Sequence, residues 1–123
     1  MTKPEPIGQT RWAIAEGYIP EWSHGREPEF TSHETACILN ASERDAHVEI
    51  TIYYSDREPV GPYRIVVPAR HTKHVRFNPE PIPRGTDYSS VIVSDVPIVV
   101  QHTRLDSRQS ENALLTTIAY GAP

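Results

Sequence analysis

Alternation of apolar and polar residues runs through most of this chain. It is clearest in Ala46–Tyr54, where Val48, Ile50, Ile52 and Tyr54 all fall on one face. A period of two residues with many β-branched side chains predicts a half-buried antiparallel strand. The same pattern predicts shorter strands around Trp12 and at residues 35–40, 63–67, 72–77, 89–93 and 97–104.

The segment Ala113–Ala119 is apolar throughout, so periodicity alone fits a last strand and a short helix equally. It is also a candidate for a subunit interface or for docking of a partner. Its alternative role is that of an ordinary edge element of the core.

Turn signals separate these segments at the spacing that is typical of β-sandwiches. Twelve of the 123 residues are proline, which is excluded from helices and central strands and therefore favours many strand ends. No βαβ alternation and no glycine-rich phosphate loop occur. We predict an all-β fold, an antiparallel β-sandwich of jelly-roll-like type with eight or nine short strands. It forms a single domain over 9–120, flanked by a flexible N-terminal tail at 1–8 and a C-terminal end at 121–123.

Composition and charge disfavour several classes of function and location. A net charge of −4 disfavours binding to nucleic acid or anionic membranes through global electrostatics. Cys37 is the single cysteine, so it forms no intrachain disulfide, which fits a protein of a reducing compartment. We expect Cys37 to be a small apolar residue of the core. No segment approaches the roughly 20 apolar residues that cross a bilayer, and no signal peptide is present. We therefore expect a cytoplasmic protein without direct membrane insertion.

Candidate chemistry is sparse. Of six histidines, only His71 and His74 are closely spaced, and residues three apart on a strand point to opposite faces. Surface histidines are therefore favoured over a metal site. The adjacent pair His33–Glu34 fits a structural contact at a strand end better than a catalytic base with its carboxylate. The sequence predicts no enzyme, no metal and no cofactor.

A basic stretch runs from residue 64 to residue 76 without one acidic residue. If the two predicted strands in this stretch form a hairpin, its cations make a ribbon that suits nucleic-acid phosphates or an acidic partner. The alternative, which the net charge favours, is that the ribbon faces the acidic half of the protein or of a neighbouring subunit. The cations are Arg64, Arg70, Lys73, His74 and Arg76.

Polar side chains also occur where two apolar strands end. Trp12, Glu16, His102 and Arg104 could grip a small polar molecule at the rim of a sandwich, with the indole as a stacking platform. A buried salt bridge that closes the end of the sandwich, or an interface contact, explains the same residues equally well.

Long blocks of the sequence resemble the sensory rhodopsin transducer family, in order, from about Ile7 to Tyr120. The matching blocks are WAIAEGYIP, SHETACILNA, HVEITIYYSDREPVGPYR, TKHVRFN and VPIVVQHTRLDSRQSENALLTTIAY. The resemblance implies a jelly-roll β-sandwich that assembles as a homotetramer. It also implies that this protein is a cytoplasmic partner of a membrane-embedded sensory rhodopsin and that it has no enzymatic activity.

The functional hypotheses follow in order. The first is a soluble signal transducer that binds a sensory rhodopsin and relays its light state. The second is a small-molecule-binding module, for which the resemblance suggests sugars. The third is a DNA-binding regulator that uses the basic ribbon.

Overall fold

The computed structural model describes residues 6–23, 32–77, 82–109, 111 and 113–123. Within these residues it consists of strands and connecting turns, without a helix, which confirms the predicted all-β fold. The strands are β1 (Gln9–Ile14), β2 (His33–Asn40), β3 (Ala46–Tyr54), β4 (Val60–Val67), β5 (His71–Arg76), β6 (Tyr88–Asp106), β7 (Ala113–Ile118) and β8 (Tyr120–Ala122).

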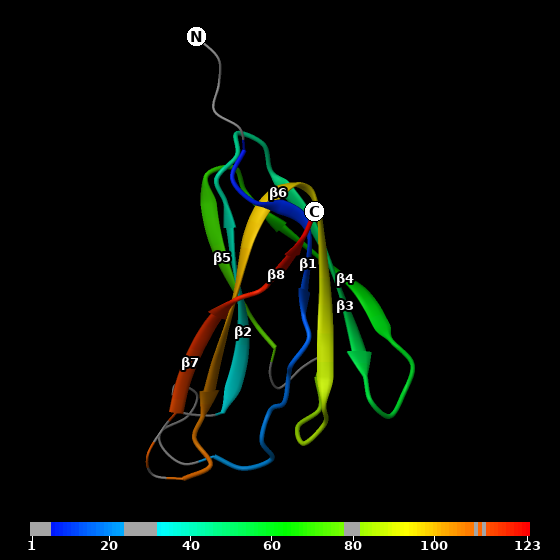
Figure 1. Ribbon diagram of the computed structural model, residues 1–123, viewed down its shortest axis with the longest axis vertical. Coiled ribbons are helices and arrows are strands. Elements are labelled where there is room, and N and C mark those ends of the chain that lie inside the picture. The colour runs from blue at the N-terminus through cyan, green and yellow to red at the C-terminus, as the bar shows by residue number, and fades with distance from the viewer. Residues whose placement is uncertain (1–5, 24–31, 78–81, 110, 112) are drawn as a thin grey trace.

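One long strand, β6, belongs to both layers of the sandwich. Its first half lies between β3 and β1, in a layer ordered β4-β3-β6-β1-β8. Its second half lies between β2 and β7, in a layer ordered β5-β2-β6-β7. Figure 1 shows β6 rising in yellow, arching over one end of the molecule and descending in orange. The two ends of this strand therefore meet at the opposite end of the sandwich.

The core follows the alternation of each strand. In β3 every second residue is buried, and in β6 the buried set continues through the bend as Ile92, Val96, Ile98 and Val100. These side chains pack against Ala36 and Ile38 of β2, in one contiguous apolar cluster. Successive side chains of a strand point to opposite faces of its sheet. Every second residue of a strand in either layer therefore points into the core between the two layers.

Three details differ from the sequence prediction or complete it. Residues 89–93 and 97–104 are one continuous strand, because the segment between them bends without leaving the extended conformation. The strands of the basic stretch do not form a hairpin: β4 pairs with β3, whereas β5 pairs with β2 in the other layer. The undecided segment forms a strand over Ala113–Ile118, β7, at the edge of the second layer.

The chain's last strand lies beside its first. Arg11, Trp12 and Ala13 of β1 pair with residues 120–122 of β8, antiparallel. Among the described residues there is no helix long and apolar enough to cross a bilayer.

The core assignment predicts a contrast between two residues of β6. Ile98 is fully buried, whereas Val93 is 42% exposed on the outer face. We expect Ile98→Ala to lower the free energy of unfolding by about 2–5 kcal/mol, because it removes buried methylenes and leaves a cavity. Val93→Ala should cost about 1 kcal/mol or less. Urea unfolding measures both, and equal losses would contradict the assignment.

Candidate functional site

A buried carboxylate, Glu34, is the centre of a polar cluster at the end of the sandwich away from the β6 bend. Its side chain is 1% exposed. Oε1 accepts hydrogen bonds from the Tyr88 hydroxyl at 2.7 Å and from His102 Nε2 at 2.8 Å. Oε2 accepts the backbone N–H of Tyr18 at 2.8 Å. Buried charge is tolerated only with such partners, so this geometry holds both layers and the Tyr18 loop together.

Arg104 connects this buried carboxylate to solvent. Its Nε lies 3.6 Å from Glu34 Oε2, and its Nη1 donates to both carboxylate oxygens of Glu16, at 2.9 and 3.1 Å. The Arg104 side chain is 20% exposed and that of Glu16 is 66% exposed. The outer half of this chain of charges is thus open to water, where an ion pair contributes about 0–1 kcal/mol and exchanges partners readily.

Tyr88 occupies a tight place in the cluster. Its ring packs edge-on against Phe77, with centroids 6.2 Å apart, and a Cβ added at Gly17 would lie 2.6 Å from the ring. Burial raises the pKa of the Tyr88 phenol far above its ordinary value, and the charge of Glu34 raises this pKa further. The phenol therefore stays a neutral donor to Glu34.

A pocket of about 380 Å³ adjoins the cluster. It brings together three of the four residues predicted to bind a ligand, and β7 supplies the opposite wall. The lining residues are Glu16, His102, Arg104, Leu115, Thr116 and Thr117.

The fourth predicted residue, Trp12, does not reach this pocket. Its side chain is 6% exposed, and its indole N–H donates to the carbonyls of Gln9 and Ile98, at 2.9 and 3.1 Å. The ring lies under Gly121 of β8 and belongs to the core of the first layer. The predicted stacking platform is therefore wrong, because the inward face of β1 buries the indole on the side of the β6 bend.

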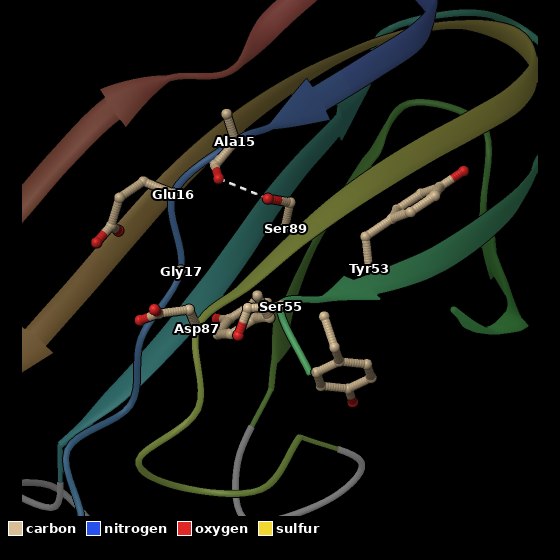
Figure 2. A pocket seen from close by; sticks show the side chains of 9 residues that line it. Ala15, Glu16, Gly17, Tyr53, Ser55, Asp87 and Ser89 are labelled. Carbon is tan, nitrogen blue, oxygen red and sulfur yellow. Dashed lines mark hydrogen bonds between the residues drawn. The ribbon is translucent and has the colours of Figure 1, made fainter. Parts of the chain in front are cut away.

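A second depression, of about 350 Å³, lies where β1 and β3 end and β6 begins (Figure 2). Three short segments line it: residues 15–17, 53–55 and 87–89. Figure 2 shows the carboxylates of Glu16 and Asp87 on one side and the ring of Tyr53 on the other. Glu16 lines both pockets, so it forms the wall between them.

The five predicted basic residues do not form one ribbon. Arg64 lies on β4, with its Nε 3.5 Å from Glu49 on β3. Arg70 lies in the turn before β5, and Lys73, His74 and Arg76 lie on β5, which is a strand of the other layer. DNA binding stays a prediction from the sequence.

Other predicted residues are placed as follows. His71 and His74 are both exposed on β5, and the described residues contain no group of three or more metal-ligating side chains. His24 lies outside the described residues. Cys37 is not a core residue: it is half-buried on the outer face of β2, with its Sγ 3.7 Å from the Thr103 hydroxyl.

Sequence reasoning assigned Glu34 to a structural contact with His33 at a strand end and did not predict its partners Tyr18, Tyr88 and His102, and it missed Tyr88 altogether. A signal for Glu34 was present, because it shares the inward face of β2 with Ala36 and Ile38. A carboxylate in register with buried positions indicates a buried, partnered charge. Tyr88 gave no comparable signal, since its role depends on the bend of β6.

The sequence and the fold place this chain in a defined family. The family model described as the Anabaena sensory rhodopsin transducer matches residues 7–121, and the chain belongs to this family. Among solved structures, the Anabaena sensory rhodopsin transducer is 70% identical, with a TM-score of 0.72, covering 81% of this chain and 100% of that chain. The structure of Thermotoga maritima 1070 is 33% identical, with a TM-score of 0.84, covering 94% and 97% of the two chains. Among curated proteins, no match is found.

The raised pKa of Tyr88 predicts a pH dependence of stability. The phenol stays neutral in the folded state but ionises near pH 10 when unfolded, so its contribution is complete below about pH 10 and is lost above it. Tyr88→Phe should lower the free energy of unfolding at neutral pH by about 1–3 kcal/mol, since Glu34 loses a donor. Above pH 10, this free energy should fall less steeply in Tyr88→Phe than in the parent protein.

Urea unfolding between neutral pH and pH 11 measures both effects. Tyr53→Phe, a matched change at a 45% exposed tyrosine, should keep the parent slope. Identical alkaline slopes in the parent and Tyr88→Phe would contradict the assignment.

Proposed function

We propose that this protein is a signal transducer that binds a sensory rhodopsin and relays its light state. The observation that carries the proposal is the 70% identity to the Anabaena sensory rhodopsin transducer over the whole of that chain. Binding, rather than catalysis, is the activity proposed, and its place is the cytoplasm. A homotetramer, which the family resemblance implies, is part of the proposal.

The physical requirement for such a relay is modest. The illuminated and dark states of the receptor need to differ by only about 1.4 kcal/mol in their free energy of binding to the transducer. This difference changes the dissociation constant of the complex about tenfold. A rigid β-sandwich suits this role, because it keeps one docking face constant while the receptor changes its own.

Calorimetric titration with a detergent-solubilised sensory rhodopsin, in darkness and under illumination, tests the proposal. We expect the receptor to bind in at least one of the two states, dark or illuminated. The dissociation constants of the two states should differ by about tenfold or more. The same receptor without its retinal is the control and should give no light-dependent difference. Equal affinity in light and dark, or no binding in either, would overturn the relay.

A second candidate function is the binding of a small polar ligand, with sugars first. The pocket beside Glu16, His102 and Arg104 favours it, because a guanidinium, a carboxylate and two threonines converge on one space. Arg104→Lys keeps a positive charge near Glu34 but removes the planar fork of donors. We expect this change to weaken ligand binding at least about tenfold.

Titration of a panel of neutral and charged monosaccharides, followed by NMR, measures this binding. Arg64→Lys, the same change at an exposed arginine on β4, is the matched control and should leave it unchanged. A panel without a ligand, or a ligand that Arg104→Lys binds equally well, would remove this candidate.

A further inference from the structure

Three polar groups at the pocket beside Arg104 have unused hydrogen-bonding capacity. Arg104 donates to Glu16 through Nη1, but its Nη2 has no hydrogen-bond partner among the described residues. His102 donates from Nε2 to Glu34, which leaves the Nδ1 of this buried imidazole as an acceptor, without a partner in the described part of the chain. The carboxylate of Glu16 has room for further donors. Donors and acceptors are thus both available in one space.

The two charges that line this pocket are opposite and balanced. Glu16 supplies the negative charge and Arg104 the positive charge, while Glu34, buried next to Arg104, adds a second negative charge. An anion alone would meet repulsion from both carboxylates, and a cation alone would compete with the guanidinium for Glu16. A ligand that carries both charges avoids these conflicts, because each of its charged groups meets the opposite charge.

The wall formed by β7 is partly apolar. Leu115 and Thr117 are two residues apart on this strand, so their side chains share one face, and both line the pocket. Leu115 is 65% exposed, so its surface is available to an aliphatic group. The pocket volume of about 380 Å³ is at the small end of the range for ligand sites, which suits a compact molecule.

We infer that this pocket binds the zwitterion of a small α-amino acid. The ligand carboxylate accepts hydrogen bonds from the guanidinium of Arg104, and the ligand ammonium donates to Glu16 and to Nδ1 of His102. The ligand side chain packs against Leu115. Hydrogen bonds between charged groups are about twice as strong as those between neutral groups, so a zwitterion uses this pocket better than a neutral sugar does. The inference rests on the proposed ligand binding and names the class of ligand.

Glu16 can adjust to such a ligand. It is 66% exposed, and ion pairs that are open to water exchange partners readily. Arg104 is held independently by Glu34, whose Oε2 lies 3.6 Å from its Nε. The ammonium of a ligand can therefore take over part of the contact that Glu16 makes with Arg104, while the guanidinium stays in place.

Titration of the full chain with alanine, serine, valine and leucine, followed by amide chemical shifts in NMR spectra, tests this inference. We expect binding, with shift changes at residues 102–104 and 115–117. Each ligand is compared with the same molecule lacking one charge, which for valine gives isovalerate, without the ammonium, and isobutylamine, without the carboxylate. Both analogues should bind at least about tenfold more weakly than the amino acid.

The sign of the effect of Glu16→Gln reports the charge of the ligand. This change removes the partner of the ammonium, so amino-acid binding should weaken at least about tenfold. It would strengthen binding of a simple anion, because a competitor for Arg104 is lost, and would leave a neutral sugar nearly unaffected. Glu49→Gln, the same change at an exposed glutamate beside Arg64, is the matched control and should bind as the parent does. Circular dichroism shows whether each variant keeps the fold.

Each outcome decides one point. Analogues that bind as well as the amino acid, or a folded Glu16→Gln that binds it equally or more tightly, would overturn the zwitterion site. A panel without any ligand would overturn it as well. A monosaccharide that binds, with an affinity that Arg104→Lys lowers, would then keep the proposed ligand binding alone. The light-dependent titration decides rhodopsin binding independently of all these results.

Discussion

The continuity of β6 is the constraint on which this structure depends. One strand of 19 residues serves two layers, so a bend in its middle sets how the layers face each other. It also brings residue 88 and residues 102–104, distant in sequence, to the same end of the sandwich. The polar cluster exists because these two ends of one strand converge on Glu34 of β2.

The polar cluster is stable because hydrogen bonds and a nearby guanidinium compensate the buried charge of Glu34. A carboxylate that is 1% exposed would be very unfavourable alone, but Glu34 accepts three short hydrogen bonds and lies near the Arg104 guanidinium. Breaking a buried pair of this kind typically costs about 3–5 kcal/mol, although the pair adds little compared with an apolar replacement. Its value is therefore in geometry: it aligns two layers and a loop, and it presents Arg104 to an open pocket.

Much of the fold could be predicted from the sequence, because alternation reports directly which face of a strand is buried. The strand at 46–54 and the outline of the sandwich followed from it. Pairing partners did not, since neighbours in sequence, such as β4 and β5, lie in different layers. Three of the four residues predicted to bind a ligand line one pocket, because polar ends of apolar strands are visible in sequence. Trp12 was misplaced, because the side on which β1 is buried depends on β8 and the β6 bend.

The pairing of β1 with β8 has a consequence for how the protein is made. The outer neighbours of residues 11–13 are residues 120–122, so β1 and β8 pair although nearly the whole of this sequence lies between them. The first layer is therefore incomplete, with one side of β1 uncovered, until nearly the whole of this sequence has left the ribosome. Contacts of such long sequence separation form slowly, because closing the loop between them costs chain entropy. Completion of this layer is thus the part of folding that needs the contact of longest sequence separation in the sheet.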